Sequence, residues 1–170
     1  MLIERSRNEA INFSFDSAQE AVNFYITMAK DLFTEQQQAK IVAAIKEAEL
    51  NTSGEIKVHI EKKCKEDVLD HAAFMFDELD MQKTELRNGV LIYLAVEDRK
   101  LAILGDQGIN LKVPKNFWDA TRDVMINHFK AGEFAEGLAN GIKLAGEQLK
   151  AHYPYQSDDV NELSDDISFG

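Results

Sequence analysis

A seven-residue apolar run at residues 90–96 constrains the fold of this chain more than any other feature. The run is followed by Glu-Asp-Arg at 97–99 and by a second apolar run at 101–104. Both runs are too short for surface helices, and a charged turn separates them, so together they predict a β-hairpin. The first run has no alternation of polar and apolar residues. We therefore expect both of its faces to be buried, as in the central strand of a sheet.

Residues 55–61 alternate between polar and apolar at period two, which predicts a strand with one face in the core and the other in solvent. The expected core residues are Ile56, Val58 and Ile60, and the expected outward-facing residues are Glu55, Lys57, His59 and Glu61. This pattern is typical of an edge strand. A helical pattern at about 67–83 lies between this strand and the central one. The two strands should therefore be parallel, with a right-handed crossover, and the hairpin adds an antiparallel strand to them.

Three more stretches have helical spacing, near residues 34–50, 114–130 and 134–152. In the last of these, Gly137 and Gly141 are four residues apart and form a ridge of small residues. Each glycine costs a helix about 1 kcal/mol relative to alanine. We therefore expect another element to pack closely against this ridge.

The chain divides into three parts by pattern. Residues 1–27 form an N-terminal extension in which helical spacing begins at Ser17, and they fit either a docked extra helix or a weakly ordered appendage. Residues 28–153 form a single domain. Residues 154–170 form an acidic tail that we expect to be flexible, since its last 14 residues hold five acidic residues and no basic one.

Composition excludes several classes of function. A net charge of −11 argues against nucleic acid, because phosphate contacts need clustered Lys and Arg. The single cysteine, Cys64, excludes an intramolecular disulfide and a multi-cysteine zinc site. No apolar run is long enough to span a membrane and no secretory hydrophobic region is present, so we expect a cytoplasmic protein without membrane insertion. P-loop, HExxH and GxSxG motifs are all missing from the sequence.

The predicted topology brings three loops to one edge of the sheet, at residues 51–55, 85–89 and 105–110. They are rich in Asn, Asp, Glu and Gly, and the entry to the helix near residue 114 should lie beside them. Carboxylates, amides and backbone carbonyls are the ligands of Ca²⁺, and some of them also suit Mg²⁺. The candidate ligands are Glu55, Asn88, Asp106 and Asp119. The alternative is that these residues are only turn formers and a solvated strand end.

The order and spacing of these motifs resemble the TPM domain family over residues 34–153. The resemblance rests on Asn-Thr-Ser-Gly-Glu at 51–55, Asn-Gly-Val-Leu at 88–91, Asp-Arg-Lys at 98–100 and Gly-Ile-Asn at 108–110. It continues in residues 129–142, which are similar to the family's F-x-x-G-x-Y/F-x-x-G-L-x-x-G-I pattern. The resemblance implies a three-layer α/β/α sandwich with a small mixed sheet of three to four strands and C-terminal helices. This chain differs from many members in residues 105–110, where Asn110 replaces a glutamate and Asp106 is added.

Two functions follow from the resemblance, because some members are reported to bind Ca²⁺ or other divalent cations and a plant member is described as an acid phosphatase. The first is a non-catalytic module that binds a divalent cation and a protein partner. The second is a metal-assisted, phosphatase-like hydrolase, which would need positive charge to stabilise the transferring phosphoryl group. The predicted edge offers Arg87 and little else of positive sign. The charge inventory therefore favours binding over catalysis.

Overall fold

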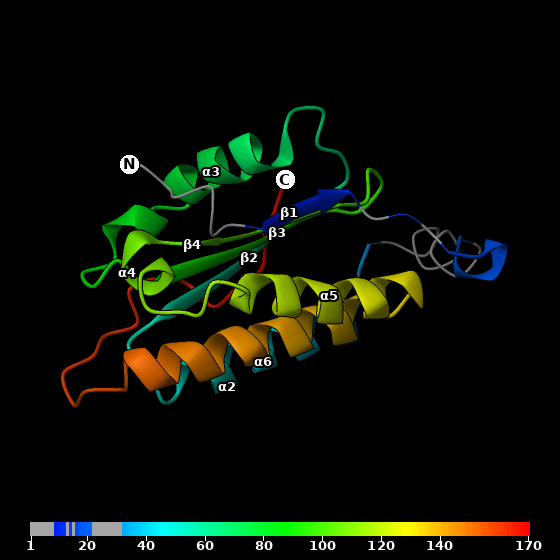
Figure 1. Ribbon diagram of the computed structural model, residues 1–170. Helices are drawn as coiled ribbons and strands as arrows, with labels where there is room; N and C mark the ends of the chain where they lie inside the picture. The colour runs from blue at the N-terminus through cyan, green and yellow to red at the C-terminus, as the bar shows by residue number, and fades with distance from the viewer. Residues whose placement is uncertain (1–8, 13, 15, 22–31) are drawn as a thin grey trace.

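The computed structural model describes residues 9–12, 14, 16–21 and 32–170. Its centre is a mixed five-stranded sheet in the order β1-β4-β3-β2-β5 (Figure 1). The strands are β1 (Glu9–Asn12), β2 (Glu55–Glu61), β3 (Gly89–Ala95), β4 (Lys100–Gly105) and β5 (Ser168–Phe169). The helix predicted from Ser17 onward falls mainly on residues 22–31, which lie outside the described residues.

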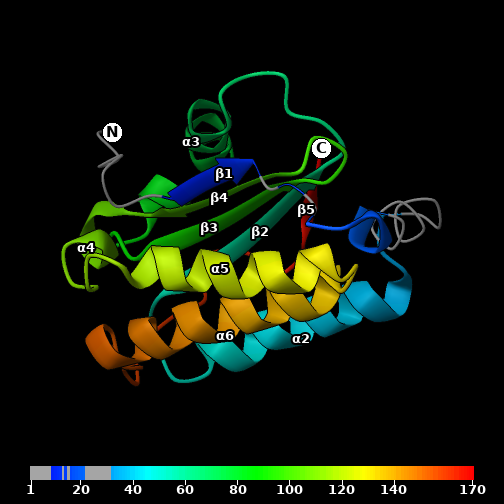
Figure 2. The ribbon, with the colours of Figure 1, turned by 45° about the vertical axis from the view of Figure 1, so that its right-hand side comes forward.

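Helices cover both faces of the sheet, so the predicted three-layer α/β/α class is confirmed (Figures 1 and 2). One face carries α3 (Val68–Glu78) and the short 3₁₀ helix η2 (Met81–Lys83). The other face carries α2 (Glu35–Glu49), α5 (Phe117–Lys130) and α6 (Phe134–His152). A further short helix, α4 (Gln107–Asn110), follows β4. The separate apolar cores on the two sides of the sheet account for the buried strand β3, whose residues all lie in the interior.

The strand pairings follow the predicted topology. β2 and β3 are parallel and in register from Glu55↔Gly89, and β3 and β4 form the antiparallel hairpin. The two short strands β1 and β5 extend the sheet at its edges, where β1 pairs antiparallel with β4 and β5 pairs parallel with β2. Neither had a clear period in the sequence, since four and two residues are too few to show one.

The small-residue ridge of α6 packs as expected. A Cβ atom added at Gly137 would lie 2.6 Å from Cε1 of Phe129, and Gly141 lies against Met125, so α5 is the close neighbour. Gly146, further along α6, lies against Ala48 of α2. These contacts hold the three helices of this layer together.

The prediction that β2 is an edge strand with a solvent-facing polar side is wrong. Three of its four polar residues are buried, with Glu55 4%, Lys57 8% and His59 2% exposed, and Glu61 is partly buried. The C-terminal tail lies along this strand and pairs with it through β5. A period-two pattern cannot reveal a covering segment that lies more than 100 residues away in the sequence.

Candidate functional site

The three loops predicted to converge do meet at one edge of the sheet. The amide of Asp106 donates to the carbonyl of Gly89 over 2.8 Å, and the amide of Gly108 donates to the carbonyl of Arg87 over 2.8 Å. The side chain of Asn88 donates through Nδ2 to the carbonyl of Ser53 over 3.2 Å. The 85–89 loop is therefore the middle of the three: it is hydrogen-bonded to the 105–110 loop on one side and to the 51–55 loop on the other.

Asp106 is engaged by Arg87. The Arg87 guanidinium donates through Nε and Nη2 to the two carboxylate oxygens, at 2.6 and 2.8 Å. The same carboxylate accepts the amide of Gln107 at 2.7 Å and so caps α4. The hydrogen bonds with Asp106 raise the pKa of the Arg87 guanidinium above its usual range. Asp106 is 1% exposed, and its position is that of a clamp between two loops.

Asp119 lies on α5, beside the buried Trp118. Its carboxylate accepts a hydrogen bond from Nη1 of Arg122 at 3.0 Å, one turn further along the same helix. The side chain of Asp119 is 44% exposed. Its charge is thus paired on the helix surface.

Glu55 is the most unusual of the four predicted residues. One carboxylate oxygen, Oε1, accepts the amide of Glu162 from the tail at 2.8 Å. The other, Oε2, is buried and has no hydrogen-bond partner in the described part of the chain. Burial is the largest of the causes that together raise the pKa of Glu55 to about 7. The charges of Glu162 and Asp165 act in the same direction, and backbone hydrogen bonds from the tail act against them. Asn88 likewise has a buried Oδ1 that accepts from none of the described residues.

Glu49 stands next to Glu55 at the end of α2. Its Oε1 accepts the amide of Ile56 at 2.6 Å. Burial is the largest cause that raises the pKa of Glu49 to about 9, and the charges of Glu55 and Asp165 act in the same direction. The carboxyl groups of Glu49 and Glu55 are therefore close enough to Asp165 of the tail for its charge to raise the pKa values of both.

These three carboxyl groups line a pocket of about 500 Å³ between the 49–55 segment and the tail. Asp159 and Asn161 of the tail add further side-chain oxygens, and Lys46 adds one basic group. Four carboxyl groups and one amide thus line one cavity. Oxygen donors of this kind suit a hard cation.

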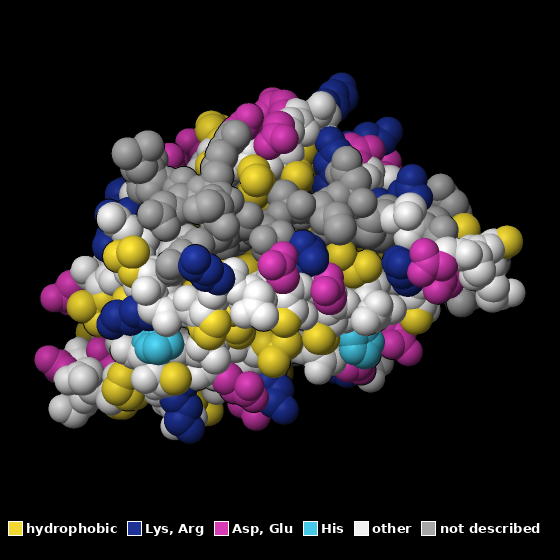
Figure 3. Space-filling view, viewed as in Figure 1, with side chains coloured by type: hydrophobic (Ala, Val, Ile, Leu, Met, Phe, Trp, Pro, Cys, Tyr) yellow, Lys and Arg dark blue, Asp and Glu magenta, His cyan; other side chains and the backbone are white. Residues whose placement is uncertain are grey.

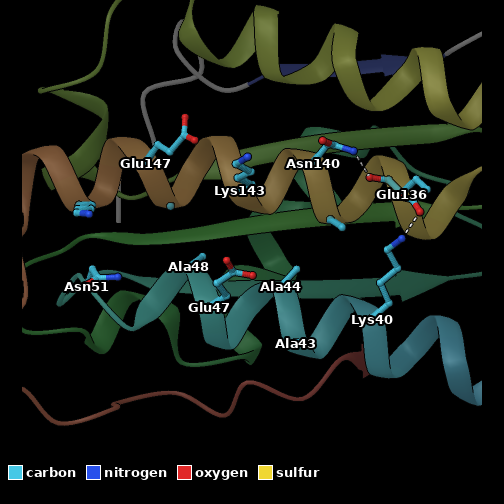
Figure 4. Close-up of a pocket in the computed structure, with 13 residues that line it drawn as sticks. Lys40, Ala43, Ala44, Glu47, Ala48, Asn51, Glu136, Asn140, Lys143 and Glu147 are labelled. Atoms are coloured by element: carbon cyan, nitrogen blue, oxygen red, sulfur yellow. Dashed lines mark hydrogen bonds and ion pairs between the residues drawn. The ribbon is translucent and has the colours of Figure 1, made fainter.

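A second pocket, of about 560 Å³, is a groove between α2 and α6 (Figure 4). Its floor is formed by small residues such as Ala44 and Ala48, and its walls carry lysines and glutamates in equal numbers, with Lys40 paired to Glu136. The opposite charges on these walls balance. Within the described residues this groove holds no concentration of charge of one sign, so the acidic pocket is the better candidate for chemistry.

Residues 26–148 match the sequence model of the TPM domain. This match covers most of the chain. The chain belongs to the TPM domain family. It is also similar to a solved structure, the NMR structure of BA42 protein from the psychrophilic bacterium Bizionia argentinensis, with 48% identity and a TM-score of 0.78. The similarity covers 83% of this chain and 97% of that one. No curated protein matches this chain significantly.

Asn110 is a structural residue in this TPM domain. Its Nδ2 donates to the carbonyl of Gly105 at 2.7 Å, and its Oδ1 accepts from Nε1 of Trp118 at 3.0 Å. Asn110 is 1% exposed. It therefore ties the end of β4 to the start of α5.

Sequence reasoning found Glu55 but missed its neighbours Glu49, Asp159, Asn161 and Asp165. The sequence gives no signal that separates Glu49 from the other polar residues of its helix, and it predicts the tail as a separate segment. The acidic composition of the tail is the one sequence feature that points to these residues, and it does not say which part of the fold the tail contacts. Only the fold brings the tail back to the first strand.

A second polar cluster lies further along β2 in this TPM domain. The two oxygens of Glu61 contact Nε2 of His59 at 3.1 Å and Nε2 of His71 at 3.0 Å, and Tyr93 donates its hydroxyl to Oε2 at 2.6 Å. Burial raises the pKa of Glu61, but the hydrogen bonds from Tyr93 and His59 outweigh it and the net pKa is lowered. His59 is thus buried, contrary to the expectation of an exposed strand residue.

In the part of the chain that the structure describes, no three His, Cys, Asp or Glu side chains are placed so that they hold a metal ion as they stand. None of the described helices is long and apolar enough to cross a membrane.

On the face of this TPM domain shown in Figure 3, acidic and basic side chains are interspersed, without a continuous basic patch.

Proposed function

We propose that this TPM domain binds a divalent cation, with calcium the best candidate, at the end of the sheet edge formed by the 51–55 loop. The observation that carries the proposal is the Oε2 atom of Glu55, which is buried and has no hydrogen-bond partner among the described residues. A buried carboxylate oxygen without a partner is expensive, and a cation supplies the missing interaction.

The acidic pocket provides the remaining ligands. Glu49 and Asp165 flank Glu55, and the amide oxygen of Asn161 lies in the same pocket wall. Calcium accepts six to eight oxygens in irregular geometry and uses backbone carbonyls and amides as well as carboxylates. In this proposal the side chains of Glu49, Glu55 and Asp165 rotate toward a common point and supply part of such a shell, and backbone carbonyls of the pocket supply the rest. Magnesium demands a near-ideal octahedron, so we expect weaker binding of Mg²⁺.

The other sequence-predicted ligands have different roles in this proposal. Asn88 supports the 51–55 loop, because its Nδ2 donates to the carbonyl of Ser53 at 3.2 Å. Asp106 acts as the clamp that holds the 105–110 loop, because Arg87 already neutralises its carboxylate. Asp119 stays paired with Arg122 on the helix surface.

A binding role is favoured over phosphate-ester hydrolysis because the positive charge of Arg87 at this edge is already paired with a carboxylate. Arg87, the group that the sequence offered for stabilising a phosphoryl group, is held by both oxygens of Asp106. Phosphatase-like hydrolysis therefore stands as the alternative, and a protein partner and a cytoplasmic location remain parts of the proposed role.

Calorimetric titration of Ca²⁺ and Mg²⁺ into the full chain tests the proposal. We expect Glu55→Gln and Asp165→Asn each to weaken Ca²⁺ binding by about tenfold or more, since each removes one charged ligand. Asp158→Asn is the matched control, because it makes the same charge change in the tail outside the pocket. Asp106→Ala tests the ligand set predicted from the sequence, because Asp106 belongs to that set and does not line this pocket.

Equal Ca²⁺ affinity in the wild type and in Glu55→Gln would contradict the site. Loss of binding in Asp106→Ala together with full binding in Asp165→Asn would move the site to the 105–110 loop. A phosphatase assay with and without metal runs beside the titration. Metal-dependent turnover that Glu55→Gln abolishes would replace the binding role with the hydrolytic one.

A further inference from the structure

The C-terminal tail follows β2 over its whole length. Pro154 pairs with Thr52 in an isolated bridge at the start of the strand, and β5 pairs with His59 and Ile60 near its end. Figure 2 shows the tail returning past the sheet to end beside β2. The edge of β2 is therefore occupied by a segment of the same chain.

Three nearly buried polar side chains of β2 hold this segment. Lys57 donates through Nζ to the backbone carbonyls of Ser164 and Asp166, both at 2.7 Å. Glu55 accepts the amide of Glu162, and His59 bonds through Nδ1 to the hydroxyl of Ser168 at 2.9 Å. Most of these contacts reach peptide groups of the tail, so they recognise an extended backbone more than particular side chains.

The chemistry of this interface differs from that of a permanent one. Burying a lysine, a glutamate and a histidine costs free energy that apolar side chains of similar volume would not cost. Several large side chains of the tail stay in solvent, with Tyr155 53%, Val160 77% and Phe169 48% exposed. Leu163 and Ile167 supply the apolar contacts to the two cores, and both are only partly buried. Hydrophobic burial therefore holds this segment weakly.

The sequence of β2 is also compatible with a strand from which the C-terminal tail has dissociated. Its alternation of Ile56, Val58 and Ile60 with polar residues is the pattern of a strand with one wet face. With the tail removed, Glu55, Lys57 and His59 would face solvent without cost. The same residues satisfy the tail when it is docked, so this strand is compatible with both states.

We propose that the edge of β2 is a peptide-docking site that its own tail occupies reversibly and that accepts, in the tail's place, an extended acidic segment of another protein chain. Such strand addition uses main-chain hydrogen bonds for affinity and alternate side chains for specificity. Here the docked partner presents carbonyls to Lys57 and a hydroxyl-bearing residue to His59. Acidic side chains are favoured opposite Lys57, because the charges of Asp165 and Asp166 act attractively on its ammonium group.

Hydrogen exchange on the unmodified full chain tests reversibility. The amide of Gly170, which donates to the carbonyl of Ile60 at 3.1 Å, reports on tail docking. We expect it to exchange through a local opening whose rate does not change in denaturant concentrations below the unfolding transition. Amides of β3 should exchange only through global unfolding. If the Gly170 amide follows the same denaturant dependence as the β3 amides, the tail is a permanent part of the fold and the proposal is wrong.

Fluorescence anisotropy with a labelled peptide of residues 156–170 tests docking from another chain. Ser168→Pro in the full chain removes the hydroxyl that bonds His59 and places a proline in β5, which should release the tail. Ser157→Pro is the matched control, because residue 157 is the second position of the turn closed by Gln156 and Asp159, where proline is favoured.

We expect the Ser168→Pro chain to bind the peptide about tenfold or more tightly than the wild type or Ser157→Pro, since its own tail no longer competes. Lys57→Met added to Ser168→Pro should abolish the gain, and a peptide that itself carries the Ser168→Pro change should bind none of the chains. A folded Ser168→Pro chain that binds the peptide no better than the wild type would overturn the proposal. Both experiments are run without added Ca²⁺, so their outcomes separate this proposal from the calcium site.

Discussion

Arg87 and Asp106 form a two-pronged ion pair that joins the loop before β3 to the loop after β4, with N–O distances of 2.6 and 2.8 Å. Arg87 adopts a left-handed backbone conformation, with φ of 52°, to reach it. A non-glycine residue in this region carries strain that the surrounding contacts must offset. The ion pair, together with the amide of Gly108 bonding the Arg87 carbonyl at 2.8 Å, provides that compensation.

Asp106→Asn should therefore lower the free energy of unfolding by about 1–2 kcal/mol, a modest loss because the side chain of Arg87 is 37% exposed. Urea denaturation measures this difference. Asp119→Asn is the matched control, since its pair with Arg122 lies on the helix surface, and it should change the stability by less than about 0.5 kcal/mol. Equal effects of the two substitutions would show that Asp106 is not a clamp.

Glu49 and Glu55 make stability depend on pH. Their pKa values are raised from 4.5 in the unfolded chain to about 9 and about 7 in the fold. Between pH 4.5 and the raised pKa of each group, the folded protein holds a proton that the unfolded chain has released. The free energy of unfolding therefore falls as pH rises through this window. Below 4.5 both states are protonated and the effect is absent. Stability measured by denaturation at several pH values should therefore decline from about pH 5 to pH 9 in the absence of calcium. Glu49→Gln should flatten this decline, and an unchanged slope in that variant would refute the assignment.

Calcium should reverse part of this loss. A cation bound by Glu49, Glu55 and Asp165 replaces protons on the first two groups, so its affinity should increase with pH over the same window. The measurement is the same calorimetric titration at pH 6 and pH 8, in two buffers of different ionisation enthalpy, which report the protons released. Binding that releases no protons at pH 6 would be inconsistent with these ligands.

Cation binding and tail docking should also be linked, because Asp165 belongs to the tail and Glu55 bonds the amide of Glu162. If both proposals hold, saturating Ca²⁺ slows exchange of the Gly170 amide, and the Ser168→Pro chain binds Ca²⁺ more weakly by the same factor. Exchange that is insensitive to Ca²⁺ in a chain shown to bind it would mean that the two sites are independent.

Gly137→Ala tests the contact between α5 and α6. Helix propensity alone predicts a gain of about 1 kcal/mol. The added Cβ would lie 2.6 Å from the Phe129 ring, which stacks on Phe134 with ring centroids 5.0 Å apart and has little room to move. We expect a net loss of about 1–3 kcal/mol from overpacking. Thermal unfolding measures it, and a higher midpoint in the variant would show that the ridge is not closely packed.

Local patterns were enough to predict most of this fold. The apolar run of β3 and the alternation of polar and apolar residues in β2 each depend on residues close together in sequence. The topology rule for a strand-helix-strand unit then placed three loops at one edge, and the structure confirms their convergence. The glycine ridge of α6 also predicted a close neighbour correctly, because only close packing compensates for its low helix propensity.

The tertiary structure alone decided the chemistry of the site. Asp106 and Glu55 are both acidic residues beside glycines in the sequence, yet one is paired with an arginine and the other is buried with an unpartnered oxygen. The state of a carboxylate depends on its burial and its partners, and the partner of Glu55 lies 107 residues away in the tail. A polar strand and an acidic tail look like two exposed segments when each is considered alone. Their mutual burial arises only when the chain returns to β2, which no local pattern encodes.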